Sequence, residues 1–210
     1  MPILPAEPEM YPSTLWREDC PRDDRHRRWW CLHTRPRREK ALARALRTRG
    51  IPHYLPQIVY EGRTPGGRAI RSMLPLFPGY LFLHGDDPRR GAALPGDHLA
   101  SLLEVADQAA LERDLRQIHR VLSSGLPIAP EPTPASGATI RILAGPLRGL
   151  VGTAIRRGGR GRFVAPVRVL GRGVTVDLQD WPVEAVPDRP AVGCGRPPLP
   201  RAEGPACPAM

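Results

Sequence analysis

The chain is organised around one stretch of sequence, Leu74-Pro75-Leu76-Phe77-Pro78-Gly79-Tyr80-Leu81-Phe82-Leu83. Its second half alternates, which places Tyr80 and Phe82 on one face of a strand and Leu81 and Leu83 on the other. Apolar side chains on both faces indicate either a strand covered on both sides or a strand with one face reserved for a partner.

A tight turn precedes this strand. Pro78 fixes one φ angle and lacks an N–H donor, and Gly79 tolerates a positive φ or the close approach of another backbone. The sequence therefore predicts a strand that is entered through a Pro-Gly turn.

Proline-rich segments divide the 210 residues. The four prolines between residues 126 and 136 exclude a helix there and predict an extended linker. Helical and extended patterns alternate before this linker, whereas only short strands follow it. We therefore predict a disordered N-terminal tail, a mixed domain, a linker, an all-β domain and a disordered C-terminal tail, at residues 1–26, 27–125, 126–136, 137–187 and 188–210.

The formal net charge of +10 favours polyanionic partners. Its distribution is uneven, because residues 141–173 carry eight arginines and no acidic residue. A polyanion is therefore expected to meet the C-terminal third of the chain more readily than the middle.

Several classes of function are not expected. The four cysteines form no Cys-x-x-Cys pair and the six histidines are scattered, so we expect no metal, no cofactor and no catalytic activity. The N-terminus has no signal pattern and no run of residues reaches the length of a membrane span, so we expect a cytoplasmic protein without membrane contact.

Two helices are predicted in the first domain. Residues 37–49 follow the strand-like run Trp29–His33 and combine a narrow apolar side with many arginines, which suit either a solvated face or a phosphate-facing surface. Asp107 can cap a second helix, in which Leu111, Leu115 and Ile118 repeat at helical spacing.

The segment after the linker contains five short runs typical of strands, which suggests a small barrel. Pro166 falls within the third run and predicts an edge or a bulge there. The five runs are residues 139–143, 150–155, 163–170, 174–178 and 183–186.

Two separate pieces of the chain resemble one family. The run Trp29–His33, the basic helix and Leu76–Phe82 are similar to the N-terminal (NGN) domain of NusG-family transcription factors. The C-terminal domain opens on a pattern that resembles a KOW motif, Gly137-x-x-Ile140-x-Ile142-x-x-Gly145-Pro146-Leu147-x-Gly149-x-x-Gly152. The resemblance implies an α+β protein: an NGN-type α/β sandwich with a mainly antiparallel sheet, plus a small all-β, SH3-like KOW barrel.

The resemblance also implies a function without catalysis, in elongation or antitermination. The N-terminal domain would bind the clamp helices of RNA polymerase, and the protein would act as a monomer. The implied polymerase-binding residues are Trp30, Tyr54, Phe77, Pro78, Gly79 and Tyr80. Arg35, Arg37 and Arg38 are then candidates for contact with the non-template DNA strand.

The role of the C-terminal domain stays open at this stage. Its arginines, Arg156, Arg157, Arg160 and Arg162, are candidates for RNA contact, whereas in the family this domain often recruits Rho or a ribosomal protein. The KOW residues either maintain the fold or contact a partner directly; they are Gly145, Pro146, Gly149 and Gly152. The Pro-rich ends favour a specialised paralogue; the alternatives are a general factor that couples polymerase to Rho or the ribosome, and an RNA- or ribosome-binding protein without polymerase contact.

Overall fold

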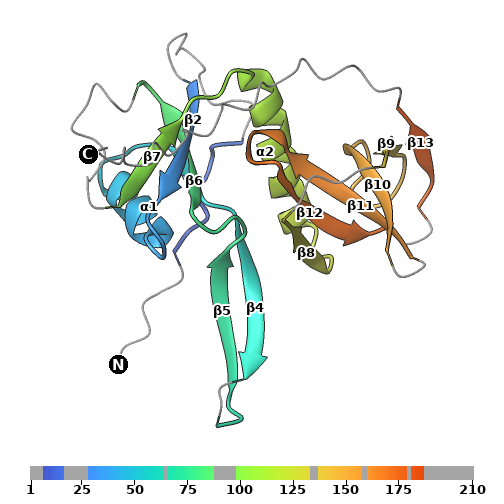
Figure 1. The fold of residues 1–210 in the computed structure, drawn as a ribbon, viewed down its shortest axis with the longest axis horizontal. Helices are drawn as coiled ribbons and strands as arrows, with labels where there is room; N and C mark the ends of the chain where they lie inside the picture. Colours follow the sequence, from blue (N-terminus) through green and yellow to red (C-terminus); the bar gives the residue numbers. More distant parts are fainter. Residues whose placement is uncertain are drawn as a thin grey trace, which may run out of the picture.

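The computed structural model describes residues 7–16, 28–63, 66–87, 98–132, 137–157, 160–178 and 181–186. Its N-terminal half is built on a five-stranded antiparallel sheet (Figure 1). The strand order is β1-β3-β6-β2-β7, with bounds Met10–Tyr11, His53–Tyr54, Tyr80–Gly85, Arg28–Thr34 and Leu99–Leu103.

Both faces of this sheet are covered. Leu81 and Leu83 of β6 face helix α1 (Glu39–Thr48) and pack with its buried Leu42 and Leu46. Phe82 lies on the opposite face, in the core that also contains helix α2 (Gln108–Ser123). The predicted alternation along β6 is therefore confirmed, and the fold is a mainly antiparallel α+β arrangement, as expected.

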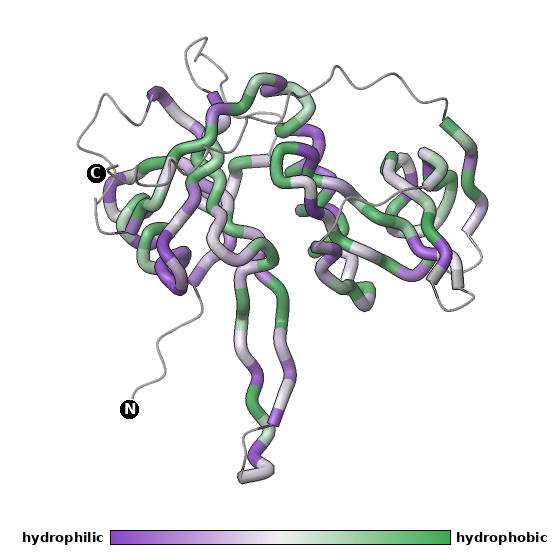
Figure 2. Tube along the Cα trace, in the orientation of Figure 1, coloured by the Kyte–Doolittle hydropathy of each residue, from purple (hydrophilic) through white to green (hydrophobic). Residues whose placement is uncertain are grey.

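A two-stranded hairpin projects from this body (Figure 1). Strand β4 (Gln57–Arg63) pairs with β5 (Ala69–Pro75), and Lys40 Nζ donates to the Met73 carbonyl oxygen at 2.6 Å. Hydrophobic residues occur along both strands (Figure 2), and Tyr60 is 49% exposed. The hairpin thus carries apolar side chains into solvent.

The C-terminal half is a six-stranded antiparallel sheet. All five strands predicted for this part of the chain are present, and a further strand, β8 (Ile128–Glu131), joins them. The order is β13-β9-β10-β11-β12-β8, with Val183–Ala185, Ala138–Ile142, Val151–Arg157, Arg160–Val167 and Arg172–Asp177 as the first five strands. A short 3-10 helix, η1 (Arg168–Leu170), joins β11 to β12.

Prolines shape two places in this sheet. Pro166 lies inside β11 and pairs with Gly173 of β12, but the pairing of β11 with β10 extends only to Val164, so no partner on that side needs the missing N–H. Pro130 lies in β8, which is an edge strand. Residues 128–131 of the predicted linker are therefore extended and not helical, as expected, but they pair as an edge strand, which tolerates the prolines that exclude a helix.

The prediction of a flexible N-terminal tail is also wrong in part. Residues 7–16 lie against the first sheet, and two of them form strand β1, which pairs with β3. The remainder of the predicted tail, residues 1–6 and 17–26, lies outside the described residues, as does the predicted C-terminal tail, residues 188–210.

Helix α2 contacts both halves of the protein (Figure 1). Its first residue, Gln108, exchanges two hydrogen bonds with the backbone of Trp29 in β2, at 2.6 and 3.0 Å. Further along, Gln117 Oε1 accepts from the Val151 N–H at 2.9 Å, and Arg120 donates to the Arg148 carbonyl oxygen at 2.8 Å. Asp107 caps the helix, as predicted, by accepting from the Ala110 N–H.

A buried carboxylate fastens α2 to the C-terminal sheet. Asp114, whose side chain is 1% exposed, accepts from the Arg168 backbone N–H at 2.9 Å and from its guanidinium at 3.1 Å. Burial raises the pKa of Asp114 to about 6, although both Arg168 contacts oppose the shift.

No helix in the described ranges has both the length and the apolar composition that crossing a membrane requires.

The Asp114 contact predicts a specific dependence of stability on pH. Because its pKa is higher in the folded protein than the usual 3.8, Asp114 contributes stability that is fully present below pH 3.8 and is lost as the pH rises through 6. The difference in unfolding free energy between the wild type and Asp114→Asn should fall by up to about 3 kcal/mol between pH 4 and pH 7. Urea denaturation at several pH values measures this difference, and a constant difference would contradict the assignment.

Candidate functional site

The residues that open β6 form a defined turn. The Tyr80 N–H donates to the Phe77 carbonyl oxygen at 3.0 Å, Pro78 occupies the second position, and Gly79 has a φ of +84° at the third. These are the requirements of a type II β-turn, which accepts proline at the second position and needs a positive φ at the third. The Pro-Gly turn predicted from sequence is confirmed, and we call Phe77–Tyr80 the FPGY turn.

Two contacts fix the FPGY turn to the body. The Gly79 N–H donates to Glu39 Oε1 at 2.7 Å, and the Gly79 carbonyl oxygen accepts from the Thr34 N–H at 2.8 Å. Glu39 is the first residue of α1 and Thr34 is the last residue of β2, and both are buried. The turn therefore has a single orientation relative to the start of α1.

The side chains of the turn differ in exposure. Phe77 is buried, with its ring edge-on to that of Phe82, whereas Pro78 is exposed. Tyr80 is partly exposed; the ring of His33 stacks on its ring with centroids 5.1 Å apart, and the Arg172 guanidinium lies 5.3 Å from its ring centroid. Only part of the predicted aromatic set is therefore accessible.

A basic turn lies beside the FPGY turn. Arg35, Arg37 and Arg38 are all exposed and occupy the connection from Thr34 to α1. Arg37 has a φ of +62°, which costs a non-glycine residue about 1–2 kcal/mol. Cations at the start of a helix also oppose its macrodipole. The placement of these arginines therefore lowers stability, which is typical of residues that serve a ligand.

Two of the predicted residues lie elsewhere. Along β2, side chains alternate between the two faces of the sheet, and Trp30 lies on the face that α1 covers. Trp29, Cys31 and Tyr80 lie on the other face. Tyr54 shares the Tyr80 face but is fully buried. Neither can touch a partner in this arrangement.

Residues outside the predicted set complete the FPGY turn. Glu39, His33 and Arg172 all contact it. Strand pairing could have identified His33, because β2 and β6 place it directly opposite Tyr80. The Arg172 contact joins the two halves of the chain and has no local signal in the sequence.

Several arginines of the C-terminal sheet form ion pairs with acidic residues. Arg162 pairs with Asp177 at 3.0 Å, Arg141 with Glu184 at 3.5 Å and Arg168 with Asp114. Of the other predicted RNA-contacting residues, Arg156 is exposed, and the side chains of Arg157 and Arg160 lie outside the described residues. The local positive field is therefore reduced by acids from other segments.

Gly145, Pro146 and Gly149 of the KOW-like pattern lie between β9 and β10, and Gly152 lies in β10. Gly152 packs so closely on β11 that a Cβ there would overlap the Val164 carbonyl oxygen and the Phe163 ring. Gly145 lies under the ring of Trp181, and both Gly145 and Gly149 have positive φ angles. Pro146 is exposed. A role in the fold accounts for Gly152; direct contact stays a prediction for Pro146.

A pocket of about 460 Å³ lies between residues 7–16 and α2. It includes none of the predicted site residues; its lining is Ser13, Trp16, Arg116, His119 and Arg120. Within the described ranges, no group of three or more His, Cys, Asp or Glu residues is placed to hold a metal ion.

Comparison with known families places most of the first domain in a described family. The family described as transcription termination factor nusG matches residues 27–143, which is more than half of the chain. The match includes the FPGY turn, the basic turn, α2 and β9, and it ends before β10. No curated protein matches the chain.

The positive φ of Gly79 leads to a stability prediction. A Cβ at this position would lie 3.6 Å from His33 Cδ2, an ordinary contact, so only the backbone angle resists substitution. Gly79→Ala should lower the free energy of unfolding by about 1–2 kcal/mol, measured by urea denaturation. Gly85→Ala, at the other end of β6 and without a positive φ, is the matched control. Equal losses in the two variants would show that the turn angle is not the cause.

Proposed function

The chain belongs to the NusG family of transcription factors, which are not enzymes, and we propose that it binds the clamp helices of RNA polymerase through the FPGY turn. The observation that carries this proposal is a rigid turn that presents an exposed proline and a partly exposed tyrosine. Aromatic anchors held in one orientation are favourable for docking onto helices, because little conformational entropy is lost on binding.

The burial of Phe77 and Tyr54 divides the predicted set into two roles. Pro78, Gly79 and Tyr80 make the contact, whereas Phe77 and Tyr54 support the turn from inside the sheet. Trp30 supports the α1 side of the same sheet. Because Arg172 covers part of the Tyr80 ring, the polymerase must displace this side chain to use the whole ring.

The basic turn supplies the second contact of the proposal. Arg35, Arg37 and Arg38 are exposed next to the FPGY turn, so a polymerase held by Tyr80 would bring its non-template DNA strand within reach of them. Phosphate contacts by arginine need no base sequence, which suits a factor that follows the polymerase along DNA. The proposed result is processive elongation, or antitermination by a specialised paralogue.

The C-terminal sheet is proposed to be the KOW domain that recruits a further partner. Its antiparallel strands and the KOW-like loop between β9 and β10 support this assignment. Several of its arginines pair with acids, which favours a protein partner such as Rho or a ribosomal protein over RNA.

The polymerase contact predicts a loss of binding on one substitution. Tyr80→Ala should weaken retention of purified core RNA polymerase by at least about tenfold, because it removes the central anchor of the turn. Surface-immobilised protein and a polymerase titration measure this change. Tyr60→Ala, which removes an exposed tyrosine from the hairpin, is the matched control and should bind as the wild type does. Wild-type affinity in the Tyr80→Ala variant would exclude the FPGY turn as the anchor.

The basic turn predicts a change in salt dependence. Replacing Arg35, Arg37 and Arg38 with glutamine should weaken binding to single-stranded DNA. It should also reduce the magnitude of the slope of log K against log salt by about 2, because fewer phosphate contacts form and fewer counterions are released on binding. Fluorescence anisotropy at several salt concentrations measures the slope. Arg113→Gln, an exposed arginine of α2, should leave it unchanged. A slope that is the same in the triple variant and the wild type would assign these arginines to a solvated surface.

A further inference from the structure

Residues 7–16 precede the segment that matches the family, yet they lie across the first domain from α1 to α2. Each end of this segment is held by a different element, and its middle joins the sheet. We call residues 7–16 the strap, and the surface beneath it the strap groove.

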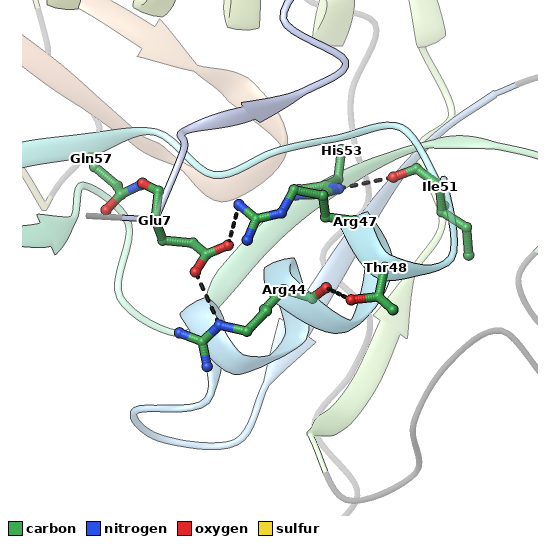
Figure 3. A network of polar contacts seen from close by, with 7 residues as sticks. All are labelled: Glu7, Arg44, Arg47, Thr48, Ile51, His53 and Gln57. Atoms are coloured by element: carbon green, nitrogen blue, oxygen red, sulfur yellow. Dashed lines mark hydrogen bonds and ion pairs between the residues drawn. The ribbon is translucent and has the colours of Figure 1, made fainter. Parts of the chain in front are cut away.

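The first end of the strap is ionic. The Glu7 side chain is 5% exposed and lies between two arginines of α1: its Oε2 accepts from Arg44 Nε at 3.1 Å, and its Oε1 forms a close ion pair with Arg47 Nη1 at 2.6 Å (Figure 3). The Glu7 carbonyl oxygen accepts from Gln57 Nε2 at 2.9 Å. The groove therefore provides two cations for a single carboxylate.

The middle of the strap adds a strand to the sheet edge. Met10 and Tyr11 pair with Tyr54 and His53 of β3, and the Glu9 carbonyl oxygen accepts from the Leu55 N–H at 2.6 Å. Burial lowers the pKa of His53, which favours the neutral form of the ring that stacks on Tyr11. Addition of an extended segment to an exposed edge is a common way for proteins to bind peptides, because backbone groups supply the affinity whatever the side chains are.

The second end of the strap is aromatic. The Trp16 ring is stacked on Trp29 and meets Tyr54 edge-on, with centroids 5.3 Å apart in both pairs. The Arg116 guanidinium lies 5.3 Å from the Trp16 ring centroid, and Arg116 Nη1 donates to the Trp16 carbonyl oxygen at 3.1 Å. Two aromatic rings and a cation therefore form a slot that fits an indole.

From these three contacts we propose that the strap groove is a peptide-docking site. In the isolated chain the strap occupies this groove. A partner protein replaces the strap there with an extended segment that contains acidic and aromatic residues. The charge of the groove argues for this occupant, since Arg44 and Arg47 lose their shared carboxylate when the strap leaves. The strap is suited to exchange because its strand pairs only two residues with the sheet.

The test uses the whole 210-residue chain and a labelled peptide with the sequence of residues 7–16, Glu-Pro-Glu-Met-Tyr-Pro-Ser-Thr-Leu-Trp. The double variant Glu7→Gln, Trp16→Ala weakens both ends of the strap and should bind this peptide at least tenfold more tightly than the wild type, whose own strap competes. Circular dichroism establishes that the variant is folded, and Trp16→Phe is a milder second variant if it is not.

Two control measurements assign the recognition to the groove. Adding Arg44→Gln and Arg47→Gln to the double variant should abolish peptide binding. A peptide that keeps Glu, Tyr and Trp at positions 1, 5 and 10 with alanine or serine elsewhere should still bind, because the groove recognises these groups and the backbone.

Two results would overturn the proposal. Absence of peptide binding by whichever of these variants is folded would make residues 7–16 a fixed part of the fold. Dimerisation of the wild type at the same concentrations, lost in the double variant, would identify the occupant as the strap of a second copy rather than a different protein.

Discussion

The arrangement of the whole molecule depends on one helix that serves two sheets. Leu115 and Ile118 of α2 are fully buried, and their core joins side chains from both halves of the chain. Polar contacts set the register of this packing, because Gln108 holds β2 while Asp114 and Gln117 hold the C-terminal sheet. Apolar contact alone permits sliding, whereas a buried carboxylate must keep its donors. The helix therefore determines where the C-terminal sheet lies.

This placement affects the FPGY turn. Arg172 belongs to the C-terminal sheet, and its guanidinium lies over the ring of Tyr80, which belongs to the N-terminal sheet. The same arrangement places Asp114 under Arg168, at the start of the η1 connection between β11 and β12. A contact that the C-terminal sheet makes is therefore part of the environment of the proposed polymerase-binding residue, and the two halves of the protein are linked at this point.

The first domain combines the FPGY turn, which hydrogen bonds hold in place, with covered aromatic residues. Glu39 and Thr34 fix the backbone of Gly79, which leaves Pro78 exposed, while Phe77 and Tyr54 are enclosed. Enclosure of Tyr54 depends in part on Trp16 of the strap. The surface that the isolated chain presents is thus smaller and more polar than the aromatic content of its sequence indicates, because segments distant in sequence cover part of it.

Local patterns in the sequence determined the elements. The alternation around Tyr80, the Pro-Gly pair, the cap at Asp107 and the strands after residue 137 all depend on neighbours in the chain, and all are present. Only the tertiary structure decided which side chains are accessible, since exposure depends on contacts between distant segments. It enclosed Tyr54, placed Trp30 on the other face, paired Arg162 with Asp177 and made an edge strand of the expected linker. Short-range spacing specifies how a segment folds, but it contains no information on what that segment meets.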